Sequence, residues 1–153
     1  MAEPTANEPE HSLNSAEAFE YLEVRTTEGE RCTNPVYLAE MLRVYLHDEV
    51  QNLASYSRQA LKSLDSYFSQ HSQVNEYNTD HLMKEFIPAL GAYLGKVVVE
   101  ELRGKWIARE PLMRSVVVVA GRELHPFGHA YQCIYQGASL TAFYDGAQRL
   151  NAA

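Results

Sequence analysis

The sequence has few cysteines and no long hydrophobic run, and both shortages exclude classes of protein. Its 153 residues include two cysteines, Cys32 and Cys133, which belong to no CxxC or Cys/His cluster. Neither a disulfide framework nor a zinc site is indicated, and we expect two free thiols in a reducing compartment. No window reaches the roughly 18 consecutive apolar residues that a membrane span needs, and residues 1–10 do not resemble a signal peptide. We therefore expect a cytoplasmic protein without a membrane segment.

Clustered positive charge is missing as well. The net charge is −7, from 13 Lys and Arg against 20 Asp and Glu. Residues 1–34 hold eight glutamates and two arginines, a net of −6, whereas the rest holds twelve acids and eleven bases, a net of −1. Neither part offers the grouped cations that neutralise nucleic-acid phosphates, so we expect no binding to DNA or RNA. The acidic leader would instead steer the chain toward a positively charged partner.

The chain has the length of one domain, and its 46% hydrophobic content is typical of a packed core. Residues 1–16 are poor in large hydrophobic side chains and rich in Pro, Glu, Asn and Ala, which predicts a disordered acidic tail. Residues 17–150 are assigned to a single α+β domain. At its start, residues 19–26 alternate well enough to predict a short strand.

A long helical region is predicted next. Asn34-Pro35 is a helix start, because Asn accepts hydrogen bonds from free N–H groups and Pro suits the first helical position. Apolar residues then recur in steps of three and four as far as Phe68. A continuous helix of that length would exceed the width of a small domain, so we expect a break between Gln51 and Ser57.

After a polar loop at residues 71–78, a second helix is predicted from residue 79 to residue 103. Pro88 must kink this helix or split off its first turn, because proline lacks the N–H that the helix ladder needs. Gly91 and Gly95 form a small-xxx-small pair, which indicates that another element packs closely against the helix.

The last third predicts a small sheet and two short helices. Residues 105–109 and the valine-rich 115–120 have the strongest strand preference in the chain. Pro126 opens a helix that Gly137 ends, and Ser139 starts another. The predicted α+β fold is therefore long N-terminal helices packed on a small antiparallel sheet, followed by two short C-terminal helices.

The segment 79–150 resembles an uncharacterised bacterial domain family. The family pattern is an LGxYLGxV helix, a GxW strand, a PFxxxY helix and an SLxxFY helix. The matching residues are Leu90-Gly91-Ala92-Tyr93-Leu94-Gly95-Lys96-Val97, Gly104-Lys105-Trp106, Pro126-Phe127-Gly128-His129-Ala130-Tyr131 and Ser139-Leu140-Thr141-Ala142-Phe143-Tyr144. The chain departs from the pattern at Lys96, where the family favours an acid. The resemblance implies a compact α+β unit and brings no catalytic residue or cofactor.

Two combinations of residues near the second strand could support chemistry. His125 and His129 are four residues apart at a helix start, a spacing that can present two imidazoles to a metal, with Glu123 and Cys133 nearby. Cys133 could also act as a nucleophile with His129 as its base. Against both, His125 is placed to cap the helix, and no oxyanion hole or HExxH motif accompanies the cysteine. We therefore predict no metal, no cofactor and no catalytic residue.

The sequence leaves two hypotheses for function. Tyrosines recur on the predicted helices, and tyrosine is enriched at protein interfaces, so a non-enzymatic interaction or regulatory module, such as an immunity protein, is the first. Its partner would be another protein or a second copy of the chain, and a scaffold subunit is a variant of it. The second is a small-molecule or metal-dependent enzyme with a cleft near Arg122. The candidate binding residues are Trp106, Arg122, His125, His129 and Tyr131.

Overall fold

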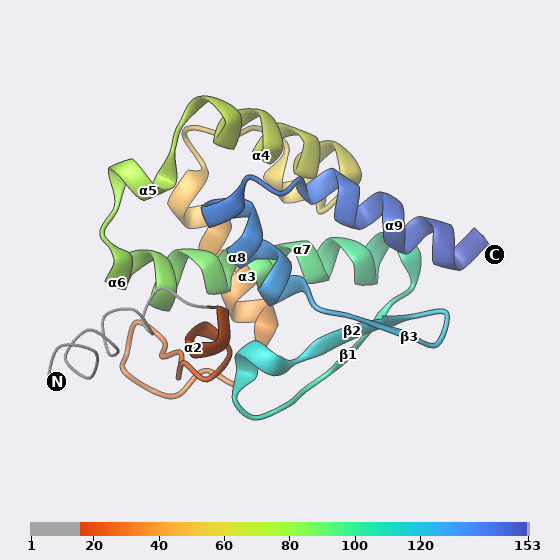
Figure 1. The fold of residues 1–153 in the computed structure, drawn as a ribbon, viewed down its shortest axis with the longest axis horizontal. Helices are drawn as coiled ribbons and strands as arrows, with labels where there is room; N and C mark the ends of the chain where they lie inside the picture. Colours follow the sequence, from red (N-terminus) through yellow and green to blue (C-terminus); the bar gives the residue numbers. More distant parts are fainter. Residues whose placement is uncertain (1–15, 153) are drawn as a thin grey trace, which may run out of the picture.

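The computed structural model describes residues 16–152, in which helices and a small sheet surround one buried helix, α7 (Ile87–Leu102) (Figure 1). Most α7 side chains are fully buried, because apolar residues occupy nearly every position of this helix. Helices α3 (Pro35–Leu46) and α8 (Pro126–Gln136) pack directly on it. The remaining helices are α2 (Ala16–Glu20), α4 (Arg58–Gln70), α5 (Gln73–Glu76), α6 (Thr79–His81) and α9 (Leu140–Ala152), with short 3-10 turns at Leu53–Ser55 and Leu112–Arg114.

The predicted start and break of the first helical region are confirmed. The Asn34 side chain accepts a hydrogen bond from the Val36 N–H at 2.9 Å, at the start of α3. Helix α3 ends at Leu46, and α4 begins only at Arg58. Between them the backbone turns through left-handed conformations at Asn52 (φ 72°) and Tyr56 (φ 46°), which few residues other than glycine adopt.

The second helical region is split as its proline predicts. A π-helical turn, η2 (Leu82–Phe86), precedes α7, and the Ile87 N–H bonds to the Leu82 carbonyl five residues back. Pro88 has no N–H to offer the carbonyl of Lys84, which removes one α-helical hydrogen bond from this turn. We refer to residues 82–86 as the π turn.

The sheet is antiparallel with strand order β1 (Lys105–Ile107), β2 (Val116–Val119) and β3 (Arg122–Leu124). Strand β3 has no counterpart among the sequence predictions. It pairs with β2 through a tight turn in which Ala120 and Gly121 both have positive φ, the type I′ geometry that suits a twisted hairpin.

Helix α7 is close to its neighbours at its two glycines, as predicted. A Cβ atom on Gly91 would lie 2.8 Å from the Phe127 Cα, and one on Gly95 would lie 2.3 Å from the Trp106 indole. The sheet and α8 can therefore lie against α7 because these two positions lack side chains. Figure 1 shows the sheet on one side of α7, with α4 and α9 on the other. The predicted α+β class is confirmed.

Two local predictions are wrong. The predicted strand at residues 19–26 is instead helix α2 followed by a turn, with one isolated bridge between Arg25 and Arg31. Phe19 is 1% exposed and its ring lies 5.6 Å from that of Tyr131, so burial of this side chain overrides the alternation of the segment. The predicted polar loop at 71–78 contains the short helix α5.

The predicted tail, residues 1–16, lies outside the described residues except for Ala16, which begins α2. Within residues 16–152, no helix combines the length and the apolar character needed to span a bilayer.

Candidate functional site

Three of the predicted site residues take part in packing. The Trp106 ring, half-buried on β1, lies over Gly95 and 5.8 Å from the ring of Phe127. Tyr131 on α8 is buried, and its ring is 4.9 Å from that of Tyr135. Trp106 and Tyr131 therefore help to fix α8 against α7 and α2.

His129 is the third. Its Nε2 atom lies 2.7 Å from the Ser139 carbonyl oxygen, and its ring is 4.8 Å from Phe143. A carbonyl can only accept, so Nε2 carries a proton and donates it. This nitrogen has no lone pair to offer a metal.

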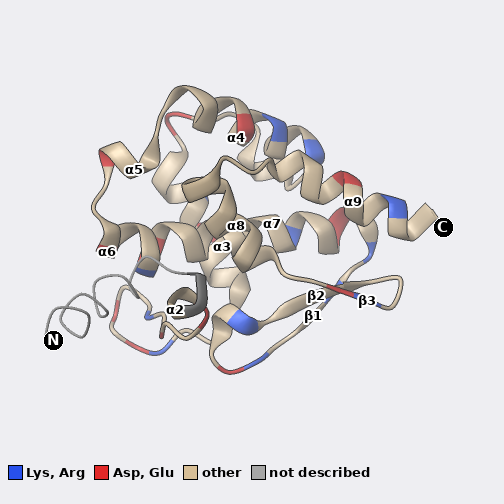
Figure 2. Ribbon diagram, viewed as in Figure 1, with Lys and Arg blue, Asp and Glu red and all other residues tan. Residues whose placement is uncertain are grey.

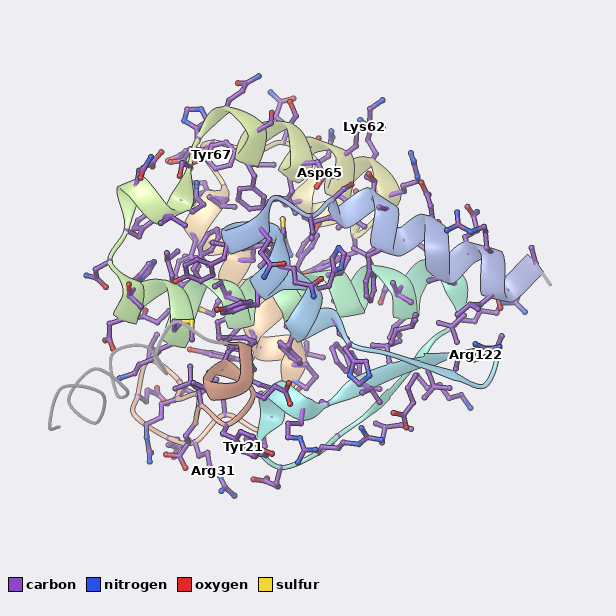
Figure 3. All side chains as sticks on the ribbon, viewed as in Figure 1. Tyr21, Arg31, Lys62, Asp65, Tyr67 and Arg122 are labelled. Carbon is purple, nitrogen blue, oxygen red and sulfur yellow. The ribbon has the colours of Figure 1, made fainter. Side chains whose placement is uncertain are left out.

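The other two predicted residues are exposed. Arg122 on β3 lies near the β2–β3 turn (Figure 3). His125 stands at the start of α8, but its side chain makes no capping hydrogen bond there. No group of three or more His, Cys, Asp and Glu residues in the described part of the chain is arranged to hold a metal ion.

Cys133 lacks the surroundings of a nucleophile. It is 6% exposed, and burial raises the pKa of its thiol to about 12, with the nearby Asp65 carboxylate adding to the shift. A thiol with this pKa stays protonated at neutral pH, and the thiolate is the reactive form. The pairing of Cys133 with His129 proposed from sequence therefore gives no activated nucleophile.

A better candidate site is a groove between α3, the π turn and the turn at residues 23–32, which we call the N-terminal turn. It is a cavity of about 450 Å³, within the size range of ligand sites. We call it the tyrosine groove. Its lining consists of Glu23, Val24, Arg25, Thr26, Thr27, Tyr37, Leu38, Met41, Tyr45, Lys84 and Glu85.

One helix face supplies the apolar part of the groove. Tyr37, Met41 and Tyr45 are spaced by four residues on α3, so their side chains follow one another along the helix. All three are half-buried, and Leu38 beside them is buried. The result is a stripe of two phenol rings and a thioether at the inner wall.

The N-terminal turn is fixed to this helix through Tyr37. The Tyr37 hydroxyl accepts a hydrogen bond from the Thr27 N–H at 3.0 Å and lies 3.4 Å from the Thr27 Oγ1. The turn is closed by the Cys32 N–H, which donates to the Val24 carbonyl at 2.7 Å. The wall of the groove that contains Glu23 is therefore held in place by hydrogen bonds.

The π turn supplies the opposite wall. The Tyr45 hydroxyl donates to the Glu85 Oε1 at 3.5 Å, and the Glu85 carboxylate also lies 3.7 Å from the Nδ1 of His81. π-helical turns are frequent at functional sites, because the extra residue redirects side chains. Here Lys84 and Glu85 are the two residues of the turn that reach the groove.

Tyr45 is the one strongly perturbed group of this groove. Burial raises its pKa to about 12, and the neighbouring Glu85 and Tyr37 contribute to the shift. The Tyr45 hydroxyl is therefore a neutral hydrogen-bonding group at physiological pH.

The charged side chains that line the groove are two acids, Glu23 and Glu85, and two bases, Arg25 and Lys84. Arg25 is paired with Glu23 and also donates to the Gly29 carbonyl at 2.8 Å, and Lys84 is paired with Asp80 at 3.0 Å. Both cations of the groove thus have anionic partners. Among the described residues, the Glu85 carboxylate is paired with the Tyr45 hydroxyl and the His81 ring.

The N-terminal turn adds further negative charge beside the groove. The Glu28 and Glu30 side chains are exposed and have no ion-pair partner in the part of the chain that the structure describes. Figure 2 shows both acidic and basic residues along this turn. The groove lining therefore carries no net charge, and the exposed Glu28 and Glu30 add negative charge beside it.

Sequence reasoning missed this groove, although its parts were visible. The tyrosines of α3 were recognised as interface candidates, and Pro88 indicated an irregular turn. The α3 tyrosines and the π turn form a groove with Glu23 only because the N-terminal turn packs against α3. A contact between segments this far apart in the sequence cannot be predicted from a local pattern.

Comparisons with known proteins place no constraint on this site: no family model, no curated protein and no solved structure matches the chain. The resemblance of residues 79–150 to a bacterial domain family stays a prediction.

Proposed function

We propose that this protein is a non-enzymatic regulatory module that binds a positively charged surface of another protein. The observation that supports it is the tyrosine groove, in which an apolar stripe with two tyrosines lies between walls that each hold one acid and one base. Interfaces combine an apolar, aromatic centre with a polar rim, and tyrosine is enriched in them. A mask for a basic partner, as an immunity protein provides, is one form of this function.

The charge of the chain favours a different protein over a second copy. The whole chain has a net charge of −7, and residues 1–34 contribute −6 of it. Two copies would therefore carry like net charges, which disfavour their association. A basic partner would be attracted to the chain and would associate faster at low salt.

Site-specific photocrosslinking tests the proposal. Lys84 at the rim of the groove is replaced by a photoreactive benzoylphenylalanine in the full chain, which is irradiated in a lysate of the native host cells. The matched control places the same group at Lys62, an exposed lysine on α4 outside the groove (Figure 3). A crosslinked protein is then purified by itself and its affinity is measured.

The expected partner crosslinks at position 84 and not at position 62, through a segment rich in Lys and Arg. Its affinity falls as salt is raised, and falls again in Glu85→Lys but not in Glu76→Lys, which makes the same charge change on α5. Failure to crosslink at position 84, a neutral or acidic contact segment, or salt-independent affinity would contradict the proposal. A partner recovered with an altered mass would favour an enzyme instead.

A further inference from the structure

We infer that a second cavity, between α4 and the turn that follows α3, binds a neutral oligosaccharide. This site is separate from the tyrosine groove and goes beyond the proposed function. The cavity has a volume of about 730 Å³, within the size range of small-molecule sites. We call it the glutamine cavity. Its lining consists of Glu49, Val50, Gln51, Gln59, Lys62, Ser63, Ser66, Tyr67, Gln70, His71 and Glu76.

One face of α4 supplies a wall of the glutamine cavity. Gln59, Ser63, Ser66 and Gln70 follow one another in steps of four and three, so their side chains form a single stripe along the helix. The stripe extends about 16 Å from its first to its last residue, at 1.5 Å per residue. This is longer than one sugar ring, so the wall matches an oligosaccharide better than a single sugar.

The composition of this stripe is unusual for the exposed face of a helix. Serine is a weaker helix former than alanine, lysine or glutamate, because its hydroxyl competes for backbone hydrogen bonds. Helix α4 nevertheless has Ser63 and Ser66 in its middle turns. The helix is held from its other side, where Arg58 pairs with Asp145 of α9 at 2.9 Å. A wall on a fixed helix suits ligand binding, because little has to be ordered when the ligand arrives.

Neutral hydrogen-bonding groups predominate in the lining. The side chains of Gln51, Gln59, Ser63, Ser66 and Gln70 make no hydrogen bond to another residue within residues 16–152. An amide offers donors and an acceptor at one end of a side chain, and a serine hydroxyl can do both. The hydroxyl groups around a sugar ring likewise donate and accept. The cavity therefore has the mixed set of partners that a polyhydroxyl ligand needs.

The charges of the cavity do not favour an ionic ligand. Glu49 and Glu76 lie in the same lining as Lys62, so an anion or a cation would meet charges of both signs. The Glu76 carboxylate also lies 3.8 Å from the Nδ1 of His71. An apolar ligand would face mostly polar side chains, which lose their contact with water when covered. A neutral, polar ligand avoids both costs.

Two stacked rings lie at one end of the cavity. The ring centroids of Tyr67 (Figure 3) and His71 are 4.6 Å apart, with an angle of 24° between the planes. The Gln73 Nε2 donates to the His71 carbonyl at 3.0 Å and so helps to fix this pair. Sugar rings have C–H groups on their faces, and these pack on aromatic surfaces. The pair therefore provides a contact for one ring of an oligosaccharide.

A glycan microarray tests this inference on the full chain. The tagged protein is applied to printed neutral and acidic glycans, and a bound neutral glycan is then titrated as the free oligosaccharide while backbone amide resonances are recorded by NMR. The variants are Ser63→Ala, Gln70→Ala and His71→Ala. Ser69→Ala on α4 and Gln132→Ala on α8 are matched controls, exposed and outside the cavity. Alanine favours helix, so the serine and glutamine replacements should retain the fold.

We expect a neutral glycan to bind and to shift resonances of residues 49–51 and 59–71 saturably. Ser63→Ala, Gln70→Ala and His71→Ala should each weaken this binding by about threefold or more, and the two controls should leave it unchanged. No bound glycan, binding of acidic glycans alone, shifts confined to other parts of the chain, or full affinity in the three variants would overturn the inference. Equal binding of an acetylated, amidated hexaserine peptide would also overturn it, because the cavity would then accept any polar chain.

The two sites of the molecule can be tested independently. Glu85→Lys, which should weaken the protein partner of the tyrosine groove, should leave glycan binding unchanged, since Glu85 does not line the glutamine cavity. Failure of every glycan to bind would leave the crosslink at position 84 as it is. The ligand is a free oligosaccharide and not the protein partner, so positions 62 and 76 still serve as comparisons for the tyrosine groove.

Discussion

Asp65 on α4 caps the first turn of α9 at Leu140, although the two residues are far apart in the sequence. The Asp65 Oδ1 accepts from the Leu140 N–H at 2.8 Å, and Oδ2 accepts from the Thr141 N–H at 3.0 Å. The hydroxyls of Ser139 and Thr141 donate to the same carboxylate, each at 2.9 Å. A single carboxylate thus satisfies free N–H groups of one helix and joins it to another. Figure 3 labels Asp65 on α4, the helix that lies beside α9.

Replacing Asp65 by alanine should destabilise the protein by about 2–3 kcal/mol, because several donors lose their acceptor and the positive end of the α9 dipole loses its anion. Urea unfolding followed by circular dichroism measures the change. Asp48→Ala is the control, since Asp48 is 80% exposed and contacts only the neighbouring His47. A loss in Asp65→Ala no larger than in the control would show that the cap contributes nothing to stability.

Two glycine replacements should change stability in opposite directions, because Gly95 on α7 is closely packed and Gly146 on α9 is not. Gly95→Ala forces a methyl group into the Trp106 indole and should cost about 1–3 kcal/mol. Gly146→Ala on α9 meets no atom nearer than 3.7 Å and should stabilise the protein by up to about 1 kcal/mol, because alanine favours helix. Melting temperatures of the two variants test this. A stabilised Gly95→Ala would mean that Trp106 does not lie where the structure has it.

Stability should fall in strong alkali, and Tyr56 should account for part of the loss alongside the buried Tyr45 and Tyr93. The Tyr56 hydroxyl donates to Glu40 at 2.6 Å, and burial, followed by this bond, raises its pKa to about 12. A raised pKa favours the neutral form in the folded state, so its contribution is complete below pH about 10 and is lost toward pH 12. Unfolding free energies between pH 8 and pH 12, about the range of these pKa values, measure the loss.

Tyr56→Phe should flatten this pH dependence while lowering stability at neutral pH through the lost hydrogen bond. Tyr21→Phe, at a side chain that is 59% exposed, should retain the wild-type profile. An identical alkaline slope in Tyr56→Phe and the wild type would assign the loss to other groups.

Both cysteines should react slowly in the folded protein. Cys32 and Cys133 are buried free thiols, and burial raises the pKa of each. Labelling by Ellman's reagent near pH 8 should therefore be limited by local opening, and should become fast in urea. Rapid labelling of Cys133 in the native state would return it to consideration as a nucleophile.

Local chemistry predicted the helix boundaries well. Asn34-Pro35, Pro126 and Gly137 start or end helices in the structure because capping and fixed backbone angles act within a few residues. The close packing at Gly91 and Gly95 could also be predicted, because two small residues at helical spacing indicate that another element packs on the helix.

The rest depends on contacts between distant segments. Residues 19–26 alternate like a strand, yet Phe19 is buried beneath α8, and its contact with Tyr131 decides the local structure. The groove likewise forms only because the segments that contain Glu23 and Glu85 both pack beside α3. The spacing of His125 and His129 suits a shared ion, but in the structure His129 Nε2 lies 2.7 Å from the Ser139 carbonyl oxygen and His125 is exposed.

The position of Trp106 gives the molecule an optical reporter of its own. It is the single tryptophan of the chain, lies between Gly95 and Phe127, and is not part of the groove lining. Its fluorescence therefore follows the seating of the sheet on α7 and is silent toward contacts made at Tyr45. A change in Trp106 fluorescence during a binding titration would therefore report a change in the packing of the sheet on α7, and not a contact at the groove.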